Sequence, residues 1–288
     1  MSRFLKALDQ AERDRALPRG GAFRSAGPAT FRAPEVEPAK PATLKRPAAD
    51  SAGGVDDHLV SLVAPATFEA EQYRALRHTV EQLHETGDLR IVAVSSPGMG
   101  DGKSITAINL AGALAQASDA RVLLVDADLR RPSVASLLAL GGPDGRGLVN
   151  LILDPALTLE RVARPRPPFN LSVIPAGQVA ASPYEVLTSP RLGELLDEAR
   201  RRYDYIVVDA PPLCPVHDCR VIAHWVDGFL LVVAAHHTPR RLVEEALNVV
   251  ELNKVLGFIF NGDDHPPSTY SGYYGYFGRS AAARRAAP

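Results

Sequence analysis

The chain has few lysines, two cysteines, no long apolar run and almost no net charge, and each of these features argues against a class of structure or partner. The 288 residues carry a net charge of −1, so the chain has no general attraction to nucleic acid. The only two cysteines, Cys214 and Cys219, are expected to remain thiols in a reducing compartment. The longest apolar run, 229–235, is too short to span a bilayer, and the N-terminus lacks a signal-peptide core. We therefore expect a globular cytoplasmic chain that reaches a membrane only through a partner.

Lysine usage is the most informative of these scarcities, because nearly all basic side chains are arginine. The five lysines are Lys6, Lys40, Lys45, Lys103 and Lys254. Lys103 alone lies between residues 46 and 253, inside a glycine-rich turn that separates an apolar strand from a helix. A compact ammonium kept at this one place indicates a phosphate-binding loop rather than a glycine-rich surface turn.

The loop predicts contacts to a nucleoside triphosphate. Its glycines let successive N–H groups point at phosphate oxygens, and the following helix adds its positive end. Lys103 is expected to reach the β- and γ-phosphates, and the Ser104 hydroxyl to bind Mg²⁺. Pro97 stands where the usual pattern has its first glycine. The candidate nucleotide-binding residues are Gly98, Met99, Gly100, Asp101, Gly102, Lys103, Ser104, Ile105 and, further along the chain, Arg130.

Acidic residues follow two other predicted strands. Asp126 and Asp128 end the strand at 121–126, and Asp209 ends the strand at 205–209. Mg²⁺ prefers oxygen ligands, so Ser104, Asp126 and Asp209 are the predicted metal ligands. Asp126 or Asp128 could instead accept the proton of an attacking hydroxyl. The predicted catalytic residues are thus Lys103, Asp126, Asp128 and Asp209, although any single strand-end aspartate could also be a helix cap or turn former.

The periodicity predicts an α/β fold. Apolar strands are expected at 90–95, 121–126, 171–175, 205–209, 229–234 and 255–260, with helices at 67–86, 103–117, 189–202 and 239–252. Continuous apolar strands that alternate with helices indicate a doubly wound, mainly parallel sheet with helices on both faces. Ligands in such sheets bind beyond the carboxyl ends of the strands.

The remaining segments predict the domain boundaries. Residues 1–17 hold a short amphipathic helix, residues 18–57 form a disordered Pro/Ala-rich linker, and residues 58–265 form the folded domain. Residues 266–288 form a flexible tail, either a disordered aromatic segment or a set of phenol substrates. Four of the eight tyrosines gather there: Tyr270, Tyr273, Tyr274 and Tyr276.

Several motifs together resemble one family. The loop 97–104 resembles its Walker A motif, 122–130 its Walker A′ motif and 206–212 its Walker B motif, while Glu71-x-x-Arg74-x-x-Arg77 resembles its self-association motif. With the tyrosine-rich tail, these residues resemble the bacterial tyrosine kinases of the polysaccharide-export type, in the MinD-like branch of P-loop ATPases.

That resemblance implies an ATP- and Mg²⁺-dependent protein-tyrosine autokinase. It implies that the tail tyrosines are phosphorylated in trans, in the regulation of exopolysaccharide or capsule synthesis and export. It also implies a ring of copies associated through Glu71, Arg74 and Arg77, and a cognate tyrosine phosphatase. The short N-terminal segment resembles the subgroup made as separate soluble chains, in which a transmembrane activator of the polysaccharide co-polymerase type recruits the kinase to the inner membrane.

Two other functions stay open on the sequence. A MinD/ParA-like ATPase usually carries a second lysine five residues before the Walker lysine, where this chain has Gly98. A nucleotide-dependent scaffold of a polysaccharide export complex, without kinase activity, is the other alternative. Near the expected site, Asn261 could face the nucleotide base or simply form a turn, and Asp218 could lie close to the phosphates.

Overall fold

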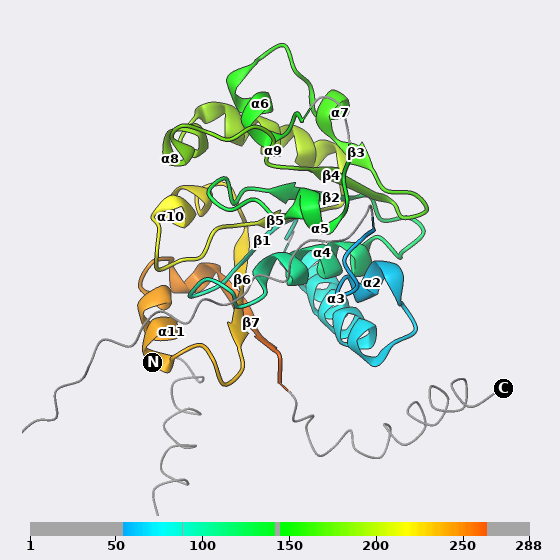
Figure 1. Cartoon of the computed structure of the whole chain (residues 1–288), viewed down its shortest axis with the longest axis vertical. Coiled ribbons are helices and arrows are strands. Elements are labelled where there is room, and N and C mark those ends of the chain that lie inside the picture. The colour runs from blue at the N-terminus through cyan, green and yellow to red at the C-terminus, as the bar shows by residue number, and fades with distance from the viewer. Residues whose placement is uncertain (1–53, 88, 142–144, 264–288) are drawn as a thin grey trace, which may run out of the picture. The chain divides into compact units, whose positions relative to one another are not determined.

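The computed structural model describes residues 54–87, 89–141 and 145–263 (Figure 1). The expected N-terminal helix, most of the linker and the tyrosine-rich tail lie outside the described residues, so these predictions stand as they are. Residues 54–57, which the sequence assigns to the linker, lie within the described part. There, Asp56 N donates to Leu137 O at 3.0 Å.

A mainly parallel sheet crosses the described domain. Its strands run in the order β3-β4-β2-β5-β1-β6-β7, and every pair is parallel except β3 with β4. The strands are β1 (Ile91–Ser95), β2 (Val122–Asp126), β3 (Arg164–Pro165), β4 (Leu171–Ile174), β5 (Tyr205–Asp209), β6 (Gly228–Ala234) and β7 (Val255–Asn261). All six expected strands are present, and the doubly wound α/β prediction is confirmed. The short β3 escaped prediction because two residues carry no periodicity.

Helices precede, separate and cover the strands. They are α2 (Val60–Val63), α3 (Phe68–Gly87), α4 (Lys103–Leu114), α5 (Val134–Leu137), α6 (Leu148–Leu153), α7 (Leu159–Val162), α8 (Pro183–Leu187), α9 (Pro190–Arg202), α10 (Asp218–Ile222) and α11 (Arg240–Leu247). The expected helices appear as α3, α4, α9 and α11, of which α4 and α11 end earlier than expected. The helices of four to six residues are too short to show a helical period. No helix in the described ranges is long and apolar enough to cross a membrane.

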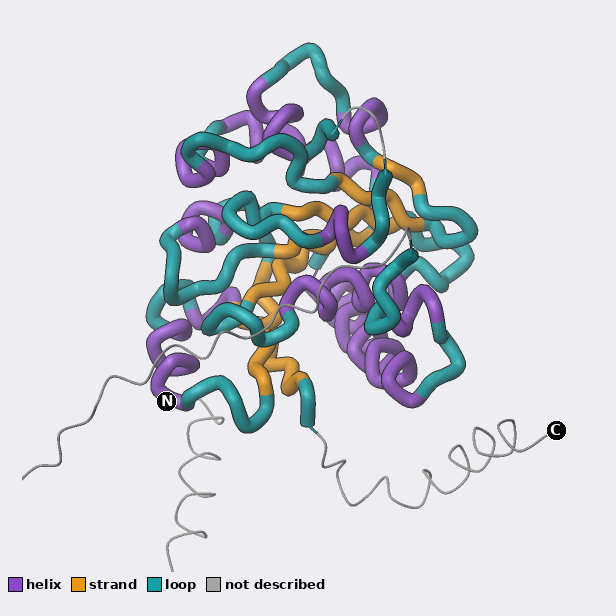
Figure 2. The backbone as a smooth tube through the Cα atoms, viewed as in Figure 1, coloured by secondary structure: helices purple, strands orange, loops and turns teal. Residues whose placement is uncertain are grey.

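Two apolar cores explain why the strands read as continuous apolar runs. In β1, Ile91 and Ala93 pack into one core, and Val92 and Val94 pack into the other. The first core lies against α6 to α11, and the second lies against α2 to α5. Figure 2 shows helices on both sides of the strands. Because side chains alternate across a strand, both sets of positions must be apolar when both faces are covered.

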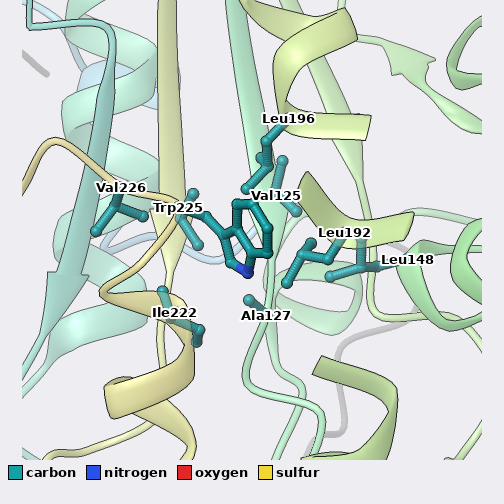
Figure 3. A pocket seen from close by; sticks show the side chains of 9 residues that line it. Val125, Ala127, Leu148, Leu192, Leu196, Ile222, Trp225 and Val226 are labelled. Atoms are coloured by element: carbon teal, nitrogen blue, oxygen red, sulfur yellow. The ribbon is translucent and has the colours of Figure 1, made fainter. Parts of the chain in front are cut away.

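Trp225, the single tryptophan, packs against the first core and contacts α9 at Gly193. A small apolar cavity of about 10 Å³ lies next to its ring (Figure 3). The cavity is lined by Val125, Ala127, Leu148, Leu192, Leu196, Val208, Ile222, Trp225 and Val226. A Cβ atom at Gly193 would lie 2.2 Å from Trp225 Cζ3, so only glycine lets the indole approach α9 this closely. The cavity is internal packing space and carries no polar group.

Gly193→Ala is therefore expected to destabilise the fold by about 1–3 kcal/mol, because the added methyl group forces the Trp225 ring out of its place. Urea unfolding followed by Trp225 fluorescence measures this loss directly. Gly257→Ala is the matched control, since nothing lies within 4 Å of a Cβ atom at that position. Equal midpoints for the two variants would contradict the packing argument.

Candidate nucleotide site

The phosphate-binding loop connects β1 to α4 at the carboxyl edge of the sheet. Gly100 and Gly102 have φ values of +87° and +94°, a left-handed conformation that favours glycine. Helix α4 begins at Lys103, and among the described residues no side chain caps it at Gly102 and no acidic residue lies in its first turn. The free N–H groups and positive end of this helix therefore favour an anion.

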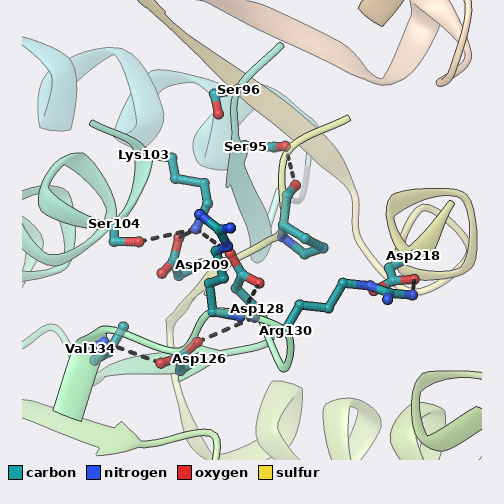
Figure 4. A network of polar contacts seen from close by, with 12 residues as sticks. Ser95, Ser96, Lys103, Ser104, Asp126, Asp128, Arg130, Val134, Asp209 and Asp218 are labelled. Carbon is teal, nitrogen blue, oxygen red and sulfur yellow. Dashed lines mark hydrogen bonds and ion pairs between the residues drawn. The ribbon is translucent and has the colours of Figure 1, made fainter. Parts of the chain in front are cut away.

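Strand order brings the acidic residues to this loop. Strand β5 lies between β1 and β2, and its Asp209 is the register partner of Asp126 on β2. Lys103 Nζ lies 2.8 Å from Asp128 Oδ2 and 3.3 Å from Asp209 Oδ1. It also donates to Ser104 Oγ at 3.1 Å. Figure 4 shows these side chains meeting from three different elements. The structure thus brings the predicted lysine, serine and two of the acids together.

The site is buried and holds more negative than positive charge. Burial alone would lower the pKa of Lys103, but Asp209 and Asp128 outweigh it and raise that pKa. Burial raises the pKa of Asp209, and the Lys103 charge opposes this shift. Asp209 Oδ2 is buried and has no hydrogen-bond partner among the described residues. An orphaned carboxylate oxygen of this kind needs a cation or a donor to satisfy it.

Asp126 has different surroundings from the other two acids. Its Oδ1 accepts from Asp128 N and its Oδ2 from Val134 N, each at 3.2 Å, so its carboxyl group holds the turn that follows β2. Burial, together with the charge of Asp209, raises the pKa of Asp126 to about 8. The predicted metal and proton-accepting roles of Asp126 stay predictions.

The raised pKa of Asp126 predicts a pH dependence of stability. The unfolded chain loses this proton near pH ~4, whereas the folded protein keeps it up to pH about 8. Within that window the folded state binds more protons, so its stability falls as pH rises, by at most about 1.4 kcal/mol per pH unit. Urea unfolding of the nucleotide-free protein between pH 5 and pH 8 measures this slope. Asp126→Asn is expected to flatten it, and an unchanged slope would contradict this assignment.

Arg130 points to a carboxylate on another element. Its Nε lies 2.7 Å from Asp218 Oδ2, and its Nη2 donates to Asp218 Oδ1 at 2.9 Å. The Asp218 side chain is fully buried. This bidentate pair joins the turn after β2 to the start of α10 (Figure 4). The predicted contact of Arg130 with the nucleotide stays a prediction.

Sequence reasoning missed how the loop itself is held. The Asp101 carboxylate is buried and accepts hydrogen bonds from Gly98 N and Thr238 Oγ1, and the predicted contact of Asp101 with the nucleotide stays a prediction. Asn261 donates to Asp101 O at 3.0 Å. Thr238 and Asn261 lie 137 and 160 positions away from Asp101, so no local spacing could have linked them to it.

The expected self-association motif lies on α3. Arg74 pairs with Glu71 and donates to Pro65 O. Arg77 Nε lies 2.6 Å from Glu81 Oε1, and its Nη1 donates to Ala113 O at 3.2 Å. Glu71 and Arg74 are substantially exposed. Their predicted role between copies stays a prediction.

Ser104 and Asp209 fit a nucleotide with Mg²⁺. The uncapped helix and Lys103 would hold phosphate charge, and Asp209 Oδ2 is an oxygen that still needs a partner. Within the described ranges, no group of three or more His, Cys, Asp and Glu side chains makes a metal site on its own.

Comparison with known proteins agrees with this arrangement. A family model described as an AAA domain matches residues 89–238. The tyrosine-protein kinase YwqD of Bacillus subtilis is 31% identical over 220 residues, which cover 76% of this chain and 91% of that protein. This chain belongs to the bacterial tyrosine kinase family.

Two further similarities support membership in the bacterial tyrosine kinase family. The kinase domain of the Escherichia coli tyrosine kinase ETK superposes with a TM-score of 0.66 at 29% identity, covering 74% of this chain and 83% of that one. The succinoglycan biosynthesis transport protein ExoP of Rhizobium meliloti is 36% identical over 207 residues. That match covers 70% of this chain and 26% of ExoP, so this kinase spans about a quarter of that relative.

Proposed function

We propose that this chain is an ATP-dependent protein-tyrosine autokinase. It transfers the γ-phosphoryl group of ATP to tyrosines of the C-terminal tail of another copy, and so regulates the synthesis and export of an exopolysaccharide or capsule. The observation that carries the proposal is the meeting of Lys103, Asp128 and Asp209 beside an uncapped helix N-terminus, at 2.8 Å and 3.3 Å. The kinase names of the relatives and the ExoP name support the reaction and the pathway.

The loop, Lys103, Ser104 and the three acids each have a role in the proposed phosphoryl transfer. The loop N–H groups and Lys103 hold the phosphates and neutralise the charge that spreads over the transferred group. The bond between the γ-phosphorus and the bridging oxygen breaks, a bond from the tyrosine oxygen to that phosphorus forms, and ADP leaves. Asp128 accepts the phenolic proton, or Asp126 does so in its ionised form, which the nucleotide-free protein reaches only near pH 8. Ser104, Asp126 and Asp209 would hold Mg²⁺, which would supply further positive charge at the phosphates.

The surroundings of the loop weigh against the MinD/ParA-like alternative. That group usually carries a lysine where this chain has Gly98. A Cβ atom at position 98 would lie 3.0 Å from Leu242 Cδ2, so Leu242 would have to move to admit a longer side chain. A kinase-inactive scaffold uses the same nucleotide contacts, so only a measurement of product separates it from the kinase.

Labelled ATP separates the three functions. The full chain is incubated with γ-labelled ATP and Mg²⁺, beside a variant with Tyr270, Tyr273, Tyr274 and Tyr276 all replaced by phenylalanine. We expect label on tyrosine in the natural chain, none in the variant, and undiminished label in the control Tyr184→Phe. Free phosphate alone would indicate an ATPase, and nucleotide binding without any product would indicate a scaffold.

A mixing experiment tests transfer between copies. The Lys103→Met chain, whose own site is expected to be inactive, serves as the acceptor. The active partner in the mixture is the chain that lacks the four tail tyrosines. We expect label on the Lys103→Met chain in the mixture and on neither chain alone. Label that never appears in the mixture would contradict transfer in trans.

We further propose that copies associate in a ring through α3, and that a separate transmembrane protein of the polysaccharide co-polymerase type recruits and activates them. A tyrosine phosphatase would reverse the reaction. ExoP supports the membrane partner, because the kinase match covers only a quarter of that longer transport protein. Glu71, with 61% of its side chain exposed, and Arg74, with 36%, are available at the surface of α3.

Arg74→Glu is expected to shift the assembly toward monomers, because it reverses the charge at an exposed position of the proposed contact and so turns attraction for an acidic group of the next copy into repulsion. Light scattering of the full chain measures the mass. Arg241→Glu is the control, since Arg241 makes a comparable surface pair with Glu245 on α11. A ring that persists in Arg74→Glu would exclude this contact.

A further inference from the structure

An acidic side chain lies inside the phosphate-binding loop, which is unexpected where phosphate must bind. Asp101 is 6% exposed, and its carboxylate turns toward the protein. Its Oδ2 accepts from Gly98 N at 3.0 Å, so the carboxylate closes the loop across three residues. Its Oδ1 accepts from Thr238 Oγ1 at 2.7 Å. Two donors, one in the loop and one outside it, thus engage the Asp101 carboxylate.

Thr238 is itself held in place on the connection between β6 and α11. Its Oγ1 accepts from Ala234 N at 3.0 Å, and its own N donates to Ala234 O at 3.0 Å. A hydroxyl has one proton to donate, and here that proton goes to Asp101. The β6–α11 connection therefore presents a fixed donor to the loop.

Asn261 holds the loop from the end of β7. Its Nδ2 donates to Asp101 O at 3.0 Å, and its backbone O accepts from Ala235 N at 2.7 Å. A Cβ atom at Gly102 would lie 2.1 Å from Asn261 Nδ2. The amide group therefore lies directly against the left-handed turn that leads into Lys103.

We propose that Thr238 and Asn261, acting through Asp101, are positioning residues that hold the loop of the nucleotide-free protein in its ligand-binding conformation. These three residues are called the loop clamp below. The inference rests on the proposed function for the identity of the ligand, ATP. Neither Thr238 nor Asn261 is part of the motifs that predicted the site. Thr238 follows β6 and Asn261 ends β7, and both strands lie on the other side of β1 from β5 and β2, which carry the acids.

The loop clamp acts on affinity rather than on the chemical step. Without Thr238 Oγ1, the carboxylate of Asp101 loses a donor and the loop populates other conformations. The apparent Kd for a ligand rises in inverse proportion to the fraction of molecules in the binding-competent conformation. Once ATP is bound, its phosphates hold the loop, so the rate at saturation is retained.

Thr238→Val tests the loop clamp, because valine keeps the shape of threonine and removes the hydroxyl. Titration of the full chain with a fluorescent ATP analogue and Mg²⁺ is expected to give a Kd about tenfold higher than that of the natural protein. The KM for ATP should rise by a similar factor with kcat unchanged. Thr238→Ser, which restores the hydroxyl, is expected to restore both constants.

Thr188→Val is the matched control, because the exposed Thr188 hydroxyl donates only to Glu185 O within its own helical turn. Its Kd is expected to equal that of the natural protein. An unchanged Kd in Thr238→Val would overturn the loop clamp while leaving the kinase proposal intact. A lowered kcat with an unchanged KM would also overturn it. Absence of binding by the natural protein would instead contradict the proposed function itself.

Discussion

Lys103→Met is expected to abolish tyrosine phosphorylation, lowering the rate by about 10³-fold or more, since the loop loses the charge that neutralises the transferred phosphoryl group. The same change is expected to destabilise the fold by about 3 kcal/mol. Lys103 is the cation that faces both Asp128 and Asp209, and its removal leaves buried acids uncompensated. Label transfer from ATP measures the first effect, and urea unfolding followed by Trp225 fluorescence measures the second.

Lys254→Met is the control for Lys103→Met. Lys254 is the other lysine in the described ranges, and its ammonium donates to backbone carbonyl groups, among them Val226 O at 3.0 Å, away from the loop. Its replacement is expected to leave the phosphorylation rate within about twofold of the natural protein, because no charge near the phosphates changes. Retained phosphorylation in Lys103→Met would overturn the assignment of the site.

Asp209→Asn is expected to lower kcat by about 10²- to 10³-fold while it stabilises the nucleotide-free protein by about 1–2 kcal/mol. Asparagine keeps the shape but removes one negative charge from a site where two buried acids, Asp128 and Asp209, share one ammonium and a third, Asp126, is buried nearby. Lys103 keeps Asp128 as its partner, so no cation is left unpaired. The loss of rate follows because Asp209 supplies the buried oxygen that has no other partner among the described residues.

Lys103→Met and Asp209→Asn serve as controls for each other, because their expected effects on stability have opposite signs. Both remove activity, but Lys103→Met is expected to lower the unfolding midpoint in urea and Asp209→Asn to raise it. Loss of activity in the more stable variant cannot come from unfolding. Asp197→Asn, on the outer side of α9, is a surface control expected to change neither quantity. A lowered midpoint in Asp209→Asn would show that the charge balance of the site is not as the structure indicates.

The loop and the sheet were predictable because their signals are local. The loop glycines, Lys103 and Ser104 all lie within the seven positions 98–104, and the strands that carry Asp126 and Asp209 are apolar runs that end in an acid. Parallel strands end at one edge of a sheet, so these groups could be expected to converge before their distances were known.

The partners of each side chain were not predictable from those signals. Asp126 and Asp128 are the same residue type and lie two positions apart, yet one accepts from backbone N–H groups and the other reaches Lys103. The bidentate contact of Arg130 with Asp218 joins residues 88 positions apart. Such contacts depend on how separate elements pack, and sequence spacing carries no record of that.

By itself, the sequence determined a mainly parallel α/β fold with a phosphate-binding loop and acids at two strand ends, because short-range backbone chemistry and strand periodicity decide these features. Only the tertiary structure decided which carboxylates face the lysine, and that Thr238 donates to the side chain of Asp101 and Asn261 to its backbone O. The physical reason is distance along the chain. The loop, the residues after β6 and the end of β7 are far apart in the sequence, and only the packing of the strands into one sheet brings their hydrogen-bonding groups together.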